Sequence, residues 1–349
     1  MGSAADWHAF LDEFRAFGGK AENVMQRKGA YGLGLFPIDP SRPVELHVPE
    51  ELLVPEKQLS INDGNLTISD PSSFPEGYAD WFARYQSNYS WGAEAKENIL
   101  KLEEGLKNLP ESLKEILKRN GVYNSEVRFP GNNEDKEIMD RYISSRAINK
   151  KGARVIMPLI ELLNHSPSAK GYDMRGNGVL VSGVYDGEVL VKYNFADPLR
   201  RFFGYGFNAL EPLAFSISCL VVHREKNVMI RGGISGKGFT VPPTIEVEEE
   251  RLVIQQPLLG STRSPKIPKT LLVQACANIE GIDGAELFDQ IIQRNIVTYV
   301  NLLRELKTSD GYVENLLRDC CLNQLFALSQ HFGQRDDLLN KSSTPEQKD

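Results

Sequence analysis

One apolar stretch, residues 155–165, constrains the fold of this chain more than any other part of the sequence. It reads Val-Ile-Met-Pro-Leu-Ile-Glu-Leu-Leu-Asn-His, and Ser166 and Pro167 follow it directly. Its length suits a buried strand or about one and a half turns of helix. It ends on Asn164 and His165, whose side chains lose hydration on burial unless polar groups are presented to them. We therefore expect either a loop start with an internally hydrogen-bonded histidine or the edge of a binding site.

Composition and charge narrow the possible functions. The chain has 349 residues, 41% of them apolar, which is enough for two or three domains. No run approaches the ~20 apolar residues of a membrane helix, so we expect a soluble protein without a membrane partner. The 40 Lys and Arg against 47 Asp and Glu give a net charge of −7 without a dense basic tract. We therefore expect a basic or neutral protein surface as the partner and no nucleic acid.

Cysteine usage indicates a reducing compartment. The four cysteines, at positions 219, 276, 320 and 321, form no C-x-x-C pair, which argues against a structural zinc site. We therefore expect no metal and a cytoplasmic protein. An organellar or nuclear location stays open if a targeting segment has been removed.

Hydrophobic periodicity divides the chain into five parts. Apolar residues spaced by three and four predict a short helix over residues 4–17, and short extended runs broken by prolines predict strands over 24–54. Helical stripes follow from residue 78, and a helix over 137–149 carries Arg146 near its end. Residues 172–191 read as β-hairpins and 214–258 as strands. The end of the chain reads as helices, the first with one apolar stripe of Phe288, Ile291, Ile292, Tyr299, Leu302, Leu303 and Leu306. The expected parts are 1–75, a helical insertion at 76–136, a catalytic segment at 137–210, a C-terminal domain at 211–339 and a frayed tail at 340–349.

Five short motifs occur in a distinctive order between residues 31 and 207. They are Gly32-Leu33-Gly34, Ser145-Arg146, Pro158 followed by Asn164-His165, Gly187-Glu188 followed by Tyr193, and Tyr205-Gly206-Phe207. In this order they resemble the SET-domain methyltransferases, and they are most similar to the non-histone branch typified by the plant Rubisco lysine methyltransferases. The cysteine-rich zinc modules that flank many histone-type members are absent here.

The resemblance implies a fold, a cofactor and a reaction. The fold is an α+β SET fold of short strands with a knotted Asn-His segment, a helical insertion and a largely helical C-terminal domain. The cofactor is S-adenosylmethionine, and the reaction is direct methyl transfer to a lysine of a non-histone protein in a tyrosine-lined channel. The implied cofactor-binding residues are Tyr31, Gly32, Leu33, Gly34, Arg146, Asn164 and His165.

The resemblance also implies catalytic and substrate-binding residues. Tyr193 matches the active-site tyrosine of the family, and Tyr205 and Phe207 match the channel wall. Tyr172 is a third candidate tyrosine at the substrate side. Glu161 stands where the nearest relatives carry Asp, so its contact with substrate stays open.

Two features differ from the family pattern and leave other functions open. Residues 194–201 replace a usual Ser-Asn-Ala-Glu-like run, and the strands expected over 214–258 do not match an all-helical C-terminal domain. In one alternative, the cofactor chemistry is the same but the methyl acceptor is a histidine side chain or a small-molecule amine. A further alternative is an inactive SET-like scaffold that binds a partner. We expect a monomer.

Overall fold

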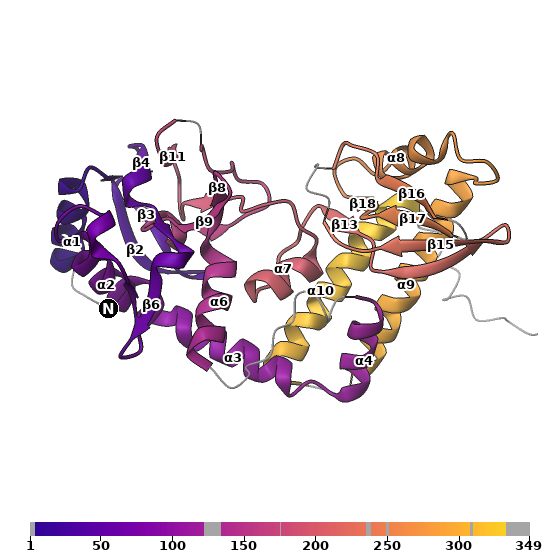
Figure 1. Cartoon of the computed structure of the whole chain (residues 1–349), viewed down its shortest axis with the longest axis horizontal. Coiled ribbons are helices and arrows are strands. Elements are labelled where there is room, and N and C mark those ends of the chain that lie inside the picture. Colours follow the sequence, from indigo (N-terminus) through magenta and orange to yellow (C-terminus); the bar gives the residue numbers. More distant parts are fainter. Residues whose placement is uncertain are drawn as a thin grey trace, which may run out of the picture. The chain divides into compact units, whose positions relative to one another are not determined.

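The computed structural model describes residues 4–121, 134–174, 176–234, 239–248, 251–307 and 310–332 (Figure 1). The chain forms two compact units. The first comprises Met1–Asn108, Arg128–Asn194 and Gly204–Gly206, and the second comprises Leu109–Val127, Phe195–Phe203 and Phe207–Asp349. The five-part division expected from the sequence remains a prediction, and the expected tail at 340–349 lies outside the described residues.

Short strands form the β part of the first unit, as predicted. They pair in the orders β1-β4-β11, β5-β9-β8, β2-β3, β6-β7 and β10-β12. Their bounds are β1 Lys20–Glu22, β2 Val24–Gly29, β3 Gly32–Pro37, β4 Val44–Val48, β5 Val54–Pro55, β6 Leu59–Asn62, β7 Asn65–Ile68, β8 Ile148–Lys150, β9 Ala153–Ile156, β10 Asn164–His165, β11 Val179–Gly183 and β12 Leu190–Val191.

Aromatic stacking attaches the N-terminal helix to the first unit. Helix α1, Ala4–Ala16, confirms the helix predicted over 4–17. The rings of Phe10 and Phe14 lie 5.0 and 5.2 Å from the ring of Trp81 in helix α2, Tyr78–Tyr89, with interplanar angles of 23° and 24°. Offset stacking of this kind adds to the free energy gained from burial.

Helices interrupt the strands of the first unit between β7 and β8, as the periodicity predicted. They are α2, a π-helical turn Trp91–Ala95, α3 Lys96–Lys107 and α6 Glu134–Arg146. Helix α4, Glu111–Arg119, belongs to the second unit, where it contacts helix α9. The helix expected over 137–149 begins and ends three residues earlier, as α6, and residues 122–133 lie outside the described part.

The apolar stretch 155–165 does not form the single strand or helical segment considered above. It divides into the end of β9, a 3-10 turn Ile160–Leu162 and the short strand β10. Leu159 takes a left-handed φ of 67° directly after Pro158, which ends the extended run. The division lets Asn164 and His165 pair with a strand outside the sheet that contains β9, because β10 runs parallel to β12.

The expected hairpin between residues 179 and 191 is also wrong. Strand β11 pairs antiparallel with β4, and β12 pairs with β10, so the two segments have different partners. Alternation of apolar residues predicts a strand but not the strand beside it, since pairing partners are chosen by non-local packing.

The second unit combines a sheet with helices. Strands β14, Cys219–His223, β15, Lys226–Arg231, β17, Arg251–Gln255, and β16, Thr244–Glu248, pair in that order, and β13, Leu213–Phe215, pairs with β18, Leu258–Ser261. The strands predicted over 214–258 are thus confirmed. The remaining helices are α7 Pro198–Tyr205, most of which lies here, α8 Ile267–Cys276, α9 Gly284–Leu306 and α10 Tyr312–Ser329.

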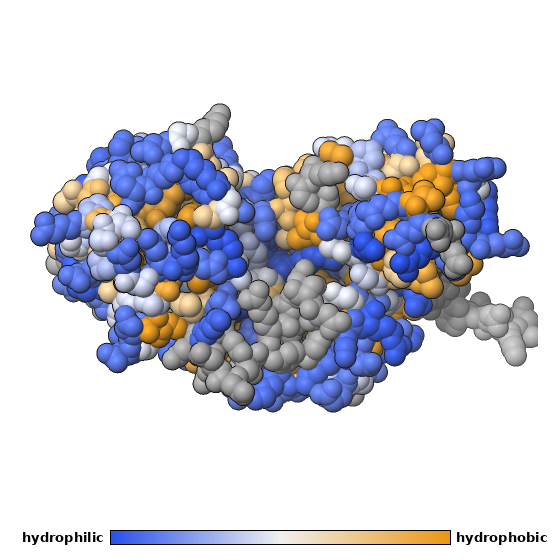
Figure 2. Space-filling view, in the orientation of Figure 1, coloured by the Kyte–Doolittle hydropathy of each residue, from blue (hydrophilic) through white to orange (hydrophobic). Residues whose placement is uncertain are grey.

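Helices α9 and α10 run side by side and contact each other (Figure 1). The predicted stripe on α9 is buried at Phe288, Ile291, Ile292, Tyr299, Leu302 and Leu306. Figure 2 shows apolar residues grouped at the surface over the sheet that carries β15 and β17. Within the described residues, no helix has both the length and the apolar character needed to cross a membrane.

Candidate functional site

The site of the first unit is built on a glycine-rich face of a hairpin. Strands β2 and β3 pair Gly29 with Gly32 and Arg27 with Gly34, so the three glycines share one face. Gly32 has a φ of 93°, which a residue with a Cβ adopts at a cost. The bare backbone lets side chains from elsewhere in the chain approach closely.

Glu188 occupies this glycine face. A Cβ at Gly34 would lie 2.2 Å from Glu188 Oε1 and 2.8 Å from Asn164 Nδ2, and one at Gly29 would lie 2.8 Å from Glu188 Oε2. Any larger residue at position 34 would therefore displace both side chains. Burial raises the pKa of the Glu188 carboxyl, and the hydrogen bond from Asn164 lowers it.

Asn164, in strand β10, links the β2–β3 hairpin to the segment that leads into β12. Its Nδ2 donates to the Leu33 carbonyl at 3.1 Å and to Glu188 Oε1 at 2.6 Å. Strand β10 pairs with β12, and the Val189 N–H donates to the Leu35 carbonyl at 2.8 Å. The Gly-x-Gly, Asn-His and Gly-Glu motifs, far apart in the sequence, thus meet at one place.

His165 and Tyr193 lie next to this junction. The Tyr193 N–H donates to His165 Nδ1 at 3.2 Å, and the two rings lie 5.1 Å apart. An Nδ1 that accepts a hydrogen bond carries no proton, so the buried imidazole is held as the Nε2–H tautomer.

The two candidate catalytic tyrosines are neighbours. The Tyr193 hydroxyl donates to the Leu163 carbonyl at 2.6 Å, and its ring lies 5.1 Å from the ring of Tyr205. Asn194 Nδ2 donates to the Tyr205 hydroxyl at 3.2 Å. Because the proton of Tyr193 is directed at a carbonyl, its oxygen can act toward any further group only as an acceptor.

Glu161 belongs to a separate, buried hydrogen-bond network. It is 6% exposed, and it accepts hydrogen bonds from Gln86 Nε2 and the Tyr142 hydroxyl, both at 2.8 Å. Burial raises its pKa, while the charge of Arg146 and hydrogen bonds from Tyr142, Gln86 and Tyr85 lower it. With its oxygens occupied by these side chains, Glu161 faces the protein interior, and its expected substrate contact remains a prediction without a geometric counterpart.

Arg146 lies beside this network, and its buried Nε–H is not satisfied by it. Its guanidinium lies 4.8 Å over the ring of Tyr142, and its Nη1 donates to Ser145 Oγ at 3.2 Å. Its buried Nε has no hydrogen-bond partner among the described residues. A buried N–H of a cation without a partner is costly, and a bound carboxylate would satisfy it.

The other predicted site residues lie elsewhere. Tyr31, at the tip of the hairpin, is 62% exposed. Tyr172 lines a cavity of about 690 Å³ together with Lys170, Met174 and Tyr185. Phe207 belongs to the second unit, and its expected place at the channel wall remains a prediction.

Three contributors were missing from the predicted site residues. The Leu163 carbonyl and Asn194 fix the two tyrosines, and Glu188 covers the glycine face. Glu188 belongs to one of the five motifs, so the signal was present in the sequence. Main-chain groups such as that of Leu163 have no sequence signal. In the described part of the chain, no three His, Cys, Asp or Glu side chains gather in a way that could hold a metal ion.

No protein-family model matches this chain, and no curated protein is significantly similar to it in sequence. Among solved structures, the SET domain of LSMT bound to lysine and AdoHcy is similar with 15% sequence identity and a TM-score of 0.42. Rubisco LSMT bound to sinefungin and monomethyllysine is similar with 16% identity and a TM-score of 0.44, and Rubisco LSMT bound to AdoMet with 14% and 0.42. Each similarity covers 98% of this chain and 92% of the solved chain. These structures are of the family that the sequence motifs resemble; with identities and TM-scores this low, the function is proposed from the site residues themselves.

Proposed function

We propose that this protein is an S-adenosylmethionine-dependent methyltransferase that methylates a lysine of a non-histone protein. The observation that carries the proposal is the meeting of Gly34, Asn164, His165, Tyr193 and Tyr205 at one place, with both tyrosine hydroxyls fixed by hydrogen bonds. An oriented pair of phenol rings beside a bare backbone strand suits an alkyl amine that must meet a flat, charged cofactor.

The residues present fit this cofactor. Arg146, with its buried and unpartnered Nε, would hold the cofactor carboxylate, and main-chain groups of the β2–β3 hairpin together with the Asn164 amide would hold the remainder. When bound, S-adenosylmethionine supplies a methyl group on a positively charged sulfur. The half-buried carboxyl of Glu188 supports a site that accepts positive charge.

The chain's own residues would orient and desolvate the acceptor. A lysine near its reference pKa of ~10.4 pays about 4.6 kcal/mol to lose its proton at pH 7, and an apolar tyrosine channel lowers this cost. Tyr193 would accept a hydrogen bond from the neutral amine, because its own proton is directed at Leu163. A phenol with a reference pKa near ~10 is a poor base at this pH, so we assign Tyr193 orientation and electrostatic stabilisation.

We place the protein in the cytoplasm as a monomer. The four cysteines are all free and buried, which supports a reducing compartment.

The first test is thermal unfolding of the full chain with and without S-adenosylmethionine. Ligand at about 100 times its dissociation constant should stabilise the folded protein by roughly 2.7 kcal/mol. Gly34→Ala should abolish this increase, because its Cβ would displace Glu188 and Asn164. Gly187→Ala is the matched control, since a Cβ there meets nothing within 4 Å. If saturating cofactor leaves the wild-type melting temperature unchanged, the protein is the binding scaffold rather than the enzyme.

The second test measures methyl transfer to proteins of a cell lysate with radiolabelled cofactor. Tyr193→Phe should reduce labelling about 100-fold while the cofactor still raises the melting temperature, because the hydroxyl acts on the acceptor and not on the cofactor. Labelled histidine in place of labelled lysine, or label only in small molecules, would change the acceptor and keep the cofactor assignment.

A further inference from the structure

Strand β14 in the second unit has an unpaired edge. It is the first strand of the four-stranded sheet, so among the described strands only β15 pairs with it. Arg224 and Glu225 join the two strands in a two-residue turn with φ of 46° and 70°, which closes the hairpin at His223 and Lys226. Hydrogen-bonded pairs alternate along an antiparallel ladder, so the N–H and C=O groups of Leu220 and Val222 point away from β15.

No hydrogen bond joins these groups to another element within the described residues. The side chains of Leu220 and Val222 are 52% and 62% exposed. An apolar strand with a free edge is a template for another extended chain unless the protein covers it.

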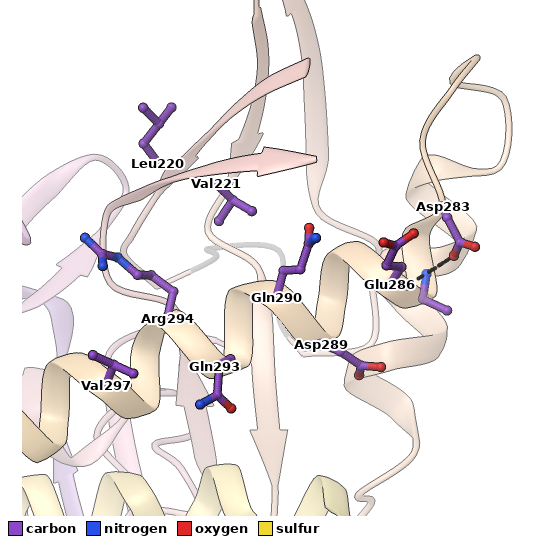
Figure 3. A pocket seen from close by; sticks show the side chains of 10 residues that line it. Leu220, Val221, Asp283, Glu286, Asp289, Gln290, Gln293, Arg294 and Val297 are labelled. Atoms are coloured by element: carbon purple, nitrogen blue, oxygen red, sulfur yellow. Dashed lines mark hydrogen bonds between the residues drawn. The ribbon is translucent and has the colours of Figure 1, made fainter. Parts of the chain in front are cut away.

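A groove runs along this edge. It has a volume of about 820 Å³ and lies between β14 and one side of helix α9. Val221 points toward the helix and Leu220 away from it, and Gln290 and Arg294 extend from the helix on the strand's side (Figure 3). Five strand residues span ~17 Å, and the helix from Asp283 to Arg294 spans a similar ~16 Å. The groove is therefore about as long as the strand that borders it.

Opposite charges mark the two ends of the groove. Asp283 and Glu286 lie at the His223 end, because the Asp283 N–H donates to His223 Nε2 at 3.1 Å. Both carboxylates share the single guanidinium of Arg224. Arg294 lies at the other end, where its charge acts on the thiol of Cys219, and it forms no ion pair with any described residue. The groove thus has an acidic end and a basic end.

We propose that β14 and this groove bind an extended segment of a partner protein, which adds to the sheet as an antiparallel strand. The segment has a basic residue at its amino-terminal end, beside Asp283 and Glu286, and an acidic residue at its carboxy-terminal end, beside Arg294. Between them it carries alternating apolar residues, two of which pack on Leu220 and Val222. This surface lies within the second unit, and its occupancy does not depend on methyl transfer.

The test uses the full chain without cofactor and a fluorescein-labelled probe, Thr-Lys-Val-Ala-Val-Glu-Thr, in a fluorescence polarisation titration. Its lysine and glutamate lie on the face that meets helix α9, and its valines lie on the face of Leu220 and Val222. In the proposed register the two valines exchange hydrogen bonds with Val222 and Leu220. N-methylation of the two valine nitrogens should weaken binding at least about tenfold, whereas N-methylation of the alanine and of the glutamate should leave it unchanged. This contrast is made in the probe, so it does not depend on a variant protein folding.

Charge reversal tests the roles of the acidic and basic ends of the groove. Arg294→Glu should weaken binding of the probe about tenfold, and a probe with its glutamate changed to Lys should regain it. Arg304→Glu, on the same helix but outside the groove, is the matched control and should bind as the wild type does. A probe with its two end charges exchanged should bind the wild type more weakly.

Three outcomes would overturn the proposal. The first is no saturable binding of the probe at millimolar concentration, and the second is equal binding of both N-methylated probes. The third is a dimer in sedimentation that Val222→Pro dissociates, since this proline removes a free-edge N–H and spares the β15 ladder. In that case the edge pairs with a second copy of the chain. None of these results bears on methylation, so they are distinguishable from failure of the proposed enzyme activity.

Discussion

Each unit of this protein contains a fully buried carboxylate, but the two are held by different chemistry. Glu161 in the first unit receives hydrogen bonds from neutral groups, the amide of Gln86 and the phenol of Tyr142. Asp197 in the second unit is 0% exposed and forms an ion pair with the guanidinium of Arg200, with further donors at the Phe215 N–H and Gln324.

The difference predicts different responses of the two carboxylates to substitution. A buried ion pair must keep both members, because removing one leaves the other charge uncompensated. A carboxylate held by neutral donors can be replaced by a neutral amide of the same shape. Glu161 also lies three residues before Asn164, and its partner Tyr142 stacks against Arg146, so its protonation bears on the candidate cofactor site.

The largest expected effect is at Asp197. Asp197→Asn should lower the free energy of unfolding by about 3–5 kcal/mol, because Arg200 and Gln324 then face another donor in place of a carboxylate. Urea unfolding followed by circular dichroism measures it. Glu111→Gln is a matched control, since Glu111 and Lys114 have the same i,i+3 spacing but Glu111 is 88% exposed. That variant should change stability by less than about 0.5 kcal/mol, and an equal loss in both variants would refute the distinction.

A smaller loss is expected from truncation of the other carboxylate. Glu161→Ala should lower the free energy of unfolding by roughly 2–3 kcal/mol, because the Gln86 amide and the Tyr142 hydroxyl lose their acceptor. The same urea titration measures it. A loss as large as that of Asp197→Asn would mean that the charge of Glu161 is compensated as tightly as that of Asp197.

The smallest effect is expected for Glu161→Gln, which should stay within about 1 kcal/mol of the wild type at pH 7. Burial raises the folded-state pKa of Glu161 above its usual 4.5, so the folded protein binds a proton more tightly than the unfolded chain. This stabilisation is complete below pH 4.5 and is lost as the pH rises through the folded pKa, with a slope of at most about 1.4 kcal/mol per pH unit. Urea titrations across this range should show the slope in the wild type and its absence in the variant. A slope that persists in the variant would place the proton on another group.

The sequence by itself determined the local structure and the order of the motifs. Periodicity predicted helix α1, the helical insertion, the strands of the second unit and the buried stripe of α9, because each reports only whether one face of a segment is buried. The order of the motifs indicated Gly34, Asn164, His165, Tyr193 and Tyr205 as candidate site residues.

Only the tertiary structure decided which segments meet. Division of the stretch 155–165, the parallel pairing of β10 with β12 and the position of Glu188 on the glycine face all depend on contacts between residues distant in sequence. The inward orientation of Glu161 is of the same kind, since it depends on donors from α2 and α6. A segment's pattern shows that it must bury a face or satisfy a polar group, but the partner is selected by the packing of the whole unit, so no local signal specifies it.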